Sequence, residues 1–292
     1  NGRGATSADQ LATVLAHDDA RGQPVLNASH SGYQRIETDG VVLLMEAGAP
    51  PPLAVSGAAH AGFLSFELSS GGHRFVVNCG TVEDDDRWRQ IARATAAHST
   101  VTVEDTSSAR FIQADRLRRR LGTLMMQGPS EVLAVREERD GGSSVVARHD
   151  GYAASFGFVH QRSLLLSADG NQLIGSDRLI PTSGRVGAKD RFAVRFHLHP
   201  GIRATRTSGG DILMVAADGE AWTLSCAMIE PELGESIFLS TVHGRRKSAQ
   251  VVIQGRARVT PEVAWSLTRT GRGRTARSSR PRGGGAAGDL FD

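Results

Sequence analysis

Short segments in which apolar and polar residues alternate recur along most of the chain. Two of them, Tyr33–Thr38 and Val41–Glu46, flank Asp39-Gly40, a pair typical of two-residue hairpin turns because both positions need positive φ. We expect further strands at residues 64–69, 74–78, 100–104, 130–137, 143–149, 152–160, 163–167, 172–179, 192–198, 212–216, 222–227, 236–242, 249–254 and 263–268. This spacing predicts an all-β protein, built as one large two-layer antiparallel β-sandwich.

Both ends of the chain depart from the strand pattern. Near the start of the chain, residues 7–16 begin with a capping serine and have the apolar spacing of a short helix. In the interior, residues 86–97 are a second helical candidate. Residues 270–292 are rich in Gly, Arg and Ser, a composition that favours disorder. The predicted organisation is a short helical region at 1–22, the sandwich at 23–269 and a disordered tail at 270–292.

The net charge of +3 comes from the tail. Residues 270–292 hold five arginines and two aspartates, so the rest of the chain is formally neutral. A neutral body does not favour a nucleic-acid surface, and no nucleic-acid partner is expected. No apolar run approaches about 18 residues, so no membrane span is expected, and the polar first residues do not resemble a signal peptide.

Two histidines lie in the densest polar block of the chain. His60 and His98 each come shortly before a predicted strand, and Asn78 ends the strand between them. Two imidazoles and one oxygen would hold zinc with an open position for water, although a neutral amide oxygen offsets the charge of the ion poorly. The alternative is structural, with both histidines capping strand ends through backbone carbonyls.

A polar stripe and a tyrosine are candidates for sugar binding. Arg195, His197 and His199 alternate along one predicted strand and therefore share a face, which can line a sugar groove or simply face solvent. Tyr33, at the start of a strand, can serve as a proton donor or acceptor in an elimination, or as a packing residue.

Two arginines are spaced as a cationic clamp. Arg89 and Arg93 lie four residues apart, so in a helix they would share one side and could bind a carboxylate in bidentate fashion. The alternative is local pairing with the acidic run at 83–86 that precedes them.

Several other chemistries find no support in the motifs. No GxSxG elbow and no Gly-rich phosphate loop before a helix occur in the chain. The two cysteines, Cys79 and Cys226, form no CxxC metal motif, and the sequence leaves open whether they pair or remain free thiols.

Five stretches carry a resemblance: SGYQRIETDGVVLLMEAG, HAGFLSFELSSGGHRFVVNCG, ATAAHSTVTVEDTSSARF, HDGYAASFGFVHQRSLLLSADG and FAVRFHLHPGI. Together they span most of residues 31–267 and resemble the C-terminal β-sandwich of the heparinase II/III-like polysaccharide lyases. Enzymes of this family join an N-terminal (α/α) toroid to the sandwich and cleave acidic polysaccharides by β-elimination. The resemblance implies that residues 1–22 end a toroid, that toroid and acidic polysaccharide are the partners, and that the location is the periplasm or cell envelope.

The resemblance also implies a zinc site, with two departures. Several members hold zinc in the sandwich, and by motif position the ligands here are His60, Asn78 and His98. Asn78 stands where those members have Asp. Ala58 stands where they have the first histidine of a His-x-His pair, which works near the substrate.

Two hypotheses from different classes result. The first is a lyase acting on a uronate-containing polysaccharide, of which this chain is the substrate-facing half. Its catalytic residues would be His60, Arg93 and His197, with Tyr33, Arg89, Arg195 and His199 binding substrate and zinc as the cofactor. The second is a non-catalytic glycan-binding or structural sandwich, which the residues at positions 58 and 78 favour.

Overall fold

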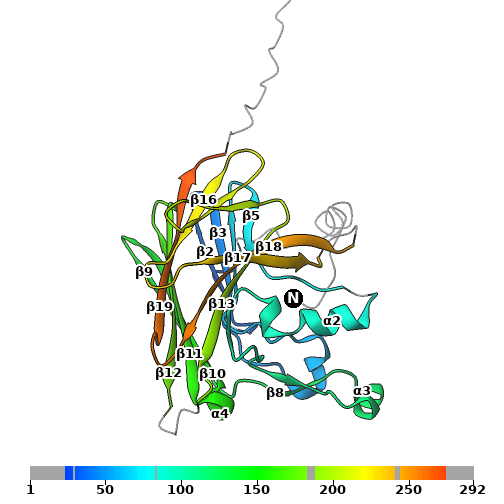
Figure 1. Ribbon diagram of the computed structural model, residues 1–292. Helices are drawn as coiled ribbons and strands as arrows, with labels where there is room; N and C mark the ends of the chain where they lie inside the picture. The colour runs from blue at the N-terminus through cyan, green and yellow to red at the C-terminus, as the bar shows by residue number, and fades with distance from the viewer. Residues whose placement is uncertain (1–23, 29, 83, 183–187, 241–243, 274–292) are drawn as a thin grey trace, which may run out of the picture.

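The computed structural model describes residues 24–28, 30–82, 84–182, 188–240 and 244–273, which form two facing antiparallel sheets with a lobe at one edge (Figure 1). The predicted all-β sandwich is confirmed. The predicted helix at 7–16 and residues 274–292 of the tail lie outside the described residues. Among the helices of the described ranges, none has the length and apolar character needed to cross a bilayer.

Within the described residues, neighbouring strands of both sheets pair in antiparallel fashion. The first sheet has the order β1 (Asn27–Ala28), β2 (Tyr33–Thr38), β3 (Val41–Glu46), β4 (Phe66–Ser70), β5 (His73–Val77), β13 (Arg191–Leu198), β18 (Arg246–Arg256), β17 (Glu232–Phe238), and β6 (Val101–Val103) also pairs with β13. The second has the order β14 (Arg203–Arg206), β15 (Ile212–Val215), β16 (Ala221–Ser225), β19 (Glu262–Gly271), β12 (Gln172–Pro181), β11 (Phe158–Ser167), β10 (Gly142–Tyr152), β9 (Val132–Arg139).

The lobe contains most of the helical residues (Figure 1). It comprises the 3-10 helices η1 (Leu53–Ala58) and η2 (Thr95–Ala97), the α-helices α2 (Asp86–Ala92) and α3 (Asp115–Leu121), and a small sheet of β7 (Arg110–Phe111) and β8 (Met125–Gln127). A separate small apolar cluster of Ala61, Phe63, Ala109 and Met125 forms its core.

Alternation along many of the strands buries one face of each sheet, as the sequence predicts. In β3, Leu43 and Met45 are fully buried, whereas Leu44 and Glu46 face outward. The hairpin of β2 and β3 has the predicted bounds, and its turn at Asp39-Gly40 has positive φ at both residues. The outward face of this hairpin is therefore available for polar chemistry.

Aromatic side chains join the two sheets across the core. Phe66 of β4 stacks on Trp265 of β19, with ring centroids 5.6 Å apart, and Phe196 of β13 meets the same indole edge-on at 4.8 Å. Pairs of this kind add to the free energy gained by burying their apolar surface.

A buried carboxylate lies beside this aromatic cluster. Asp177 of β12 accepts hydrogen bonds from His160 at 2.8 Å, from the Arg162 guanidinium at 2.8 and 2.9 Å, and from the Trp265 indole at 2.9 Å. Burial alone would raise the pKa of Asp177, but Arg162 and His160 hold that pKa well below its usual range. The carboxylate is therefore charged and fully satisfied within the second sheet.

The remaining donors of Arg162 cross to the other layer. Its Nη1 donates to the carbonyls of Leu64 at 2.9 Å and of Ser99 at 2.7 Å. Leu64 has a φ of 58°, a left-handed conformation that is uncommon for residues other than glycine. The bridge from Arg162 therefore holds two segments that lead into the lobe.

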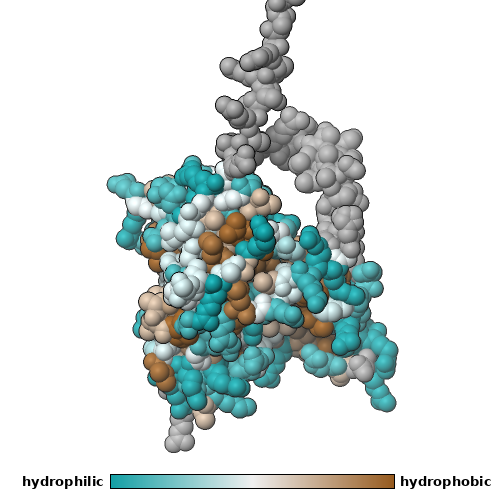
Figure 2. Space-filling model, turned by 45° about the horizontal axis from the view of Figure 1, so that its top comes forward, coloured by the Kyte–Doolittle hydropathy of each residue, from teal (hydrophilic) through white to brown (hydrophobic). Residues whose placement is uncertain are grey.

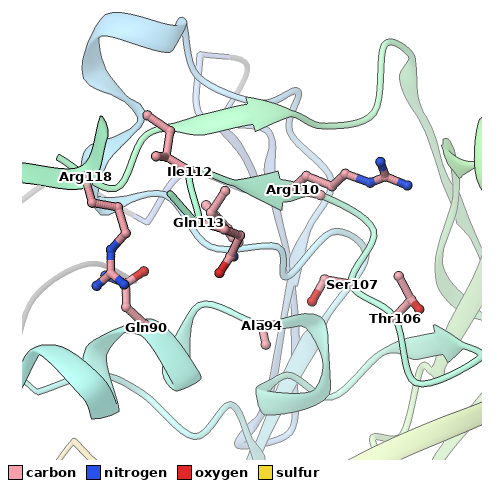
Figure 3. Close-up of a pocket in the computed structure, with 10 residues that line it drawn as sticks. Gln90, Ala94, Thr106, Ser107, Arg110, Ile112, Gln113 and Arg118 are labelled. Carbon is pink, nitrogen blue, oxygen red and sulfur yellow. The ribbon is translucent and has the colours of Figure 1, made fainter. Parts of the chain in front are cut away.

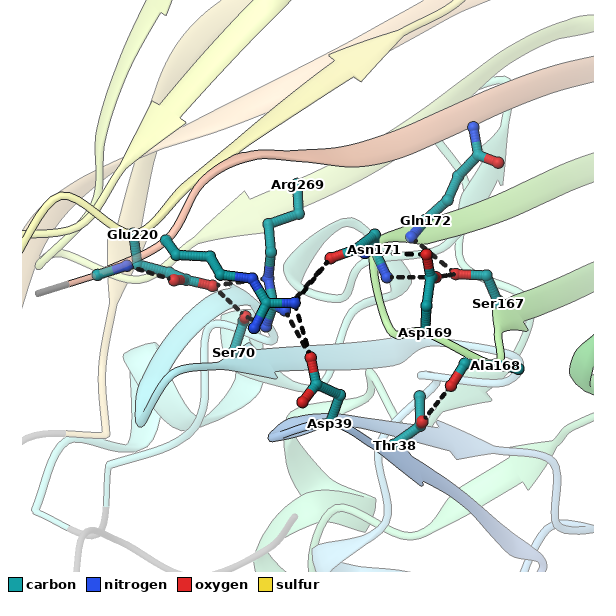
Figure 4. Close-up of polar contacts among 12 residues, drawn as sticks. Thr38, Asp39, Ser70, Ser167, Ala168, Asp169, Asn171, Gln172, Glu220 and Arg269 are labelled. Carbon is teal, nitrogen blue, oxygen red and sulfur yellow. Dashed lines mark hydrogen bonds and ion pairs between the residues drawn. The ribbon is translucent and has the colours of Figure 1, made fainter. Parts of the chain in front are cut away.

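A second bridge closes the opposite end of the sandwich (Figure 4). Arg269 of β19 donates to Ser70 of β4 at 2.6 Å and pairs with Glu220 at 3.0 Å and with Asp39 at 3.4 Å. Because Arg269 and Glu220 are almost completely buried, this contact fixes the turns of the first sheet against the second.

The structure corrects several predicted boundaries. The strands expected at 152–160 and 163–167 are one continuous strand, β11, preceded by a single helical turn, α4 (Ala153–Phe156), that ends at the left-handed Gly157. The strand expected at 236–242 lies at 232–238, because its register is set by pairing with β18. Helix α3 and the small sheet were not predicted. Both cysteines are free, and Cys79 is buried.

Replacing the buried carboxylate should strongly destabilise the fold. Asp177→Asn leaves the Arg162 guanidinium buried without a counter-ion, so we expect the free energy of unfolding to fall by about 3–5 kcal/mol. Urea unfolding measures the change. Glu137→Gln, which removes an exposed ion pair with Arg139, is the matched control and should cost less than about 1 kcal/mol. Equal effects of the two variants would contradict the assigned role of the bridge.

Candidate functional site

A polar pocket opens where the lobe meets the edge of the first sheet. It has a volume of about 620 Å³ and is lined by residues 30–33, 46–52, 58–60, 63 and 132. Tyr33, Glu46 and His60 supply its polar groups near the sheet, while Phe63 and the prolines at 50–52 supply apolar walls. No Arg or Lys is present among the described residues that line it.

The hairpin register explains why Tyr33 and Glu46 meet. They are directly opposed residues of β2 and β3 and face outward from the core. Glu67, the next outward carboxyl, lies on β4, and its Oε1 accepts from the Asn78 side-chain amide at 3.2 Å. These four side chains form a polar row across neighbouring strands.

His60 and His98 lie against this row and contact each other. His60 Nδ1 and His98 Nε2 are 3.2 Å apart, and His98 Nδ1 is 2.9 Å from the Ala94 carbonyl. Since that carbonyl requires a proton on Nδ1 of His98, its Nε2 is an unprotonated acceptor that faces His60. Burial lowers the pKa of His60 to about 3 and that of His98 to about 4, so both imidazoles are neutral near pH 7.

Glu46 has the opposite electrostatic response to the same surroundings. Burial, with a further contribution from Glu67, raises the pKa of Glu46 to about 7. A Cβ atom added at Gly62 would lie 2.6 Å from Cδ2 of His98 and 3.1 Å from Oε2 of Glu46. Only glycine at position 62 therefore leaves room for both of these side chains. The pocket therefore combines neutral imidazoles with a carboxyl that is partly protonated near neutral pH.

The predicted zinc ligands do not fit a zinc ion in this arrangement. The Asn78 carbonyl oxygen accepts from the backbone amide of Ser99 at 2.9 Å, and its amide donates to Glu67, so the side chain is already used. The two imidazoles bond to each other. Within the ranges that the structure describes, no three His, Cys, Asp or Glu side chains are grouped as a metal ion would require.

Arg93 is buried inside the lobe and does not face the pocket. Its Nε donates to the Ala59 carbonyl at 2.6 Å, Nη2 donates to Ser56 at 3.0 Å and Nη1 donates to Thr123. The guanidinium also lies over the Phe111 ring, 4.1 Å from its centroid. Helix α2 ends at Ala92, so Arg93 is its C-cap and turns inward, whereas Arg89 is exposed and pairs with Asp86 at 2.6 Å. The expected clamp is therefore not formed.

The expected stripe on β13 is interrupted by a buried histidine. His197 Nε2 donates to the Ala96 carbonyl at 2.9 Å, and its Nδ1 is 2.7 Å from the Ser236 hydroxyl. Burial lowers its pKa to about 3. Arg195 and His199 lie on either side of it, outside the lining of the pocket. Of the predicted site residues, the structure thus brings Tyr33 and His60 together at the pocket, with His98 and Asn78 behind them.

The comparisons with known proteins agree with this architecture. The model of the family described as heparinase II/III-like, C-terminal, matches residues 20–266. This chain belongs to that family. The heparinase II/III-like domain is also 31% identical over 272 residues to "FtsZ-localized protein C" of Caulobacter vibrioides, covering 89% of this chain and 46% of that protein.

Solved structures show the same fold at low sequence identity. Heparan sulfate lyase HepC from Pedobacter heparinus superposes with a TM-score of 0.63 at 16% identity, covering 91% of this chain and 40% of that one. Heparinase III, the BT4657 gene product, gives 0.62 at 14% identity, covering 89% and 37%. The chain spans less than half the length of each of these relatives.

Glu46 and Glu67 are site residues that the sequence analysis missed. A signal for Glu46 was present, because the two-residue turn at Asp39-Gly40 already fixes Tyr33 opposite Glu46. For Glu67 there was no comparable signal, since its partner Asn78 is reached only through the irregular pairing of β4 with β5.

The raised pKa of Glu46 predicts a pH-dependent stability. Between its unfolded value of 4.5 and its folded value of about 7, the folded domain keeps a proton that the unfolded chain has lost, so stability falls as pH rises through this window. Glu46 is half-buried, and we expect Glu46→Gln to reduce the loss of unfolding free energy between about pH 5 and pH 8 by about 1–2 kcal/mol. Urea unfolding at each pH, with Glu262→Gln as an exposed control, tests this. An unchanged pH profile would contradict it.

Because the predicted zinc ligands do not fit the ion, we expect the zinc content of the protein to be the same with and without the His98 imidazole. Elemental analysis of the purified protein and of His98→Ala, with His73→Ala as a control for a half-buried imidazole outside the pocket, should give equal zinc per chain. Stoichiometric zinc that is lost only in His98→Ala would show that the site binds metal after all.

Proposed function

We propose that this heparinase II/III-like domain is a non-catalytic interaction module of a protein that localises with FtsZ. The observation that carries the non-catalytic assignment is that the described residues lining the pocket include no Arg or Lys. A uronate carboxylate must be neutralised before its C5 proton can leave, and Arg93, the expected neutralising residue, donates to three backbone carbonyls instead.

The histidines support the same proposal. His197 is held between a carbonyl and a hydroxyl, which leaves neither ring nitrogen for substrate. His60 and His98 are neutral near pH 7, so neither can offset the charge of a uronate. Each of these groups has a structural use in positioning the lobe.

The role at FtsZ rests on the relative from Caulobacter vibrioides. That protein is named for its localisation with FtsZ, and it is similar to this chain over 89% of the chain. Identity at this level is much higher than the 14–16% shared with the lyase structures, which supports the fold alone.

A polysaccharide lyase is the second candidate, favoured by one specific observation. Tyr33, Glu46 and His60 surround a single pocket of sufficient size for a sugar unit, and a tyrosine with a neighbouring base is suited to β-elimination. In this case an N-terminal toroid of the kind found in the family would supply the neutralising cation, and the substrate would be an acidic polysaccharide of the cell envelope. Zinc would have no part in it, given the fit described above.

Localisation and lyase assays on the same protein distinguish the candidates. A fluorescent fusion of the full-length protein should co-localise with FtsZ and disperse when FtsZ is depleted. The Tyr33→Phe and His60→Ala variants should localise like the wild type, because the proposed role makes no use of pocket chemistry.

A lyase assay can contradict the non-catalytic proposal. Acidic polysaccharides incubated with the full-length protein should release no unsaturated products that absorb in the ultraviolet. Release that falls by roughly 10²–10⁴-fold in Tyr33→Phe would instead establish an enzyme with Tyr33 as its proton-transfer group.

A further inference from the structure

Helix α3 at the tip of the lobe concentrates positive charge and exposed apolar surface. Four of its seven residues are arginines, at positions 116, 118, 119 and 120. Leu117 and Leu121 are each 50% exposed and lie four residues apart, which places them on one side of the helix. At 100° per residue, Arg116 and Arg120 border this leucine pair on one side and Arg118 borders it on the other.

Neighbouring elements extend the charge beyond the helix. A pocket of about 390 Å³ between α2 and α3 is lined by Arg89, Arg118 and Arg119 together with Asp86. Arg118 also borders a second pocket, of about 350 Å³, where it extends toward Gln90 of α2 while Arg110 lies on another side (Figure 3). By sequence, α2 and α3 carry six arginines against Asp86 and Asp115, so the two helices have a net positive charge. Asp84 and Asp85 directly precede α2, and Asp86 pairs with Arg89 and Arg118.

The lobe leaves the leucines of this helix half-exposed. Arg93 joins η1 to the segment after α3 by donating to both the Ser56 and Thr123 carbonyls. The view in Figure 2 shows a mainly hydrophilic surface on which apolar side chains occur in small separate groups. On α3, two half-exposed leucines lie together and are bordered by arginines.

We propose that α3 docks the protein on a membrane surface that contains anionic lipids. Guanidinium groups bind lipid phosphates through paired hydrogen bonds, and short apolar side chains next to them enter the boundary between headgroups and acyl chains. The basic pocket between α2 and α3 is placed to accept a headgroup. This surface is separate from the Tyr33 pocket, so the inference does not depend on the proposed function.

The leucines favour lipid over a soluble polyanion. An acidic polysaccharide or protein segment bound by the arginines alone would leave Leu117 and Leu121 in water, whereas a bilayer removes both from water at the same time as it neutralises the arginines. Binding should therefore need both residue types and should weaken, but not vanish, as salt screens the charges.

Flotation with vesicles tests the proposal on the whole 292-residue chain. The probe is phosphatidylcholine vesicles with and without about one-third phosphatidylglycerol, at low and at physiological salt. We expect binding only with the anionic lipid. Replacing Arg116, Arg119 and Arg120 by Gln should weaken it at least about tenfold, and Leu117→Ser with Leu121→Ser should weaken it several-fold without changing the unfolding midpoint.

A matched control separates α3 from the arginine-rich end of the chain. Replacing Arg277, Arg280 and Arg282 by Gln removes the same charge and should change binding less than about twofold. Loss of binding in this control alone, or an unchanged affinity in the α3 variants, would overturn the proposal. Binding to heparin in solution that depends on the same arginines but not on the leucines, with no vesicle binding, would replace it with a polyanion site.

Discussion

The buried ion pair between Arg162 and Asp177 is the interaction on which the rest of the structure depends. An unpaired charge in the centre of a sandwich would cost several kcal/mol, so each group requires the other. Asp177 uses its oxygens within the second sheet, and Arg162 uses its spare donors on the carbonyls of Leu64 and Ser99 in the other layer. The segments held in this way carry His60 and His98, so the core determines where the candidate site lies.

The site is a consequence of packing polar groups where water is scarce. The same partial burial acts in opposite directions on acids and bases, because it disfavours whichever form is charged. It raises the pKa of Glu46 to about 7 and lowers those of His60 and His98. Near neutral pH the pocket therefore holds the neutral imidazole of His60 beside the partly protonated carboxyl of Glu46.

The lobe combines two different kinds of arginine. Arg93 is buried and satisfied by backbone carbonyls, so it acts as an internal brace between η1, α2 and the end of α3. The arginines of α3 are mostly exposed and surround two exposed leucines. A fold shared with the lyase structures thus presents here a lobe with an arginine-rich helix, while the described residues that line the Tyr33 pocket include no Arg or Lys.

The sequence by itself determined the sandwich, because alternation of apolar and polar residues has the period of a strand and holds wherever one face is buried. It also determined the pairing of Tyr33 with Glu46, since a two-residue turn fixes the register of a hairpin. Only the tertiary structure decided that His60 meets His98, that Arg93 turns inward and that His197 is covered. The reason is that alternation shows which residues share a face of a strand. It does not show what packs on that face, and residues 38 positions apart meet only when the core has joined their segments.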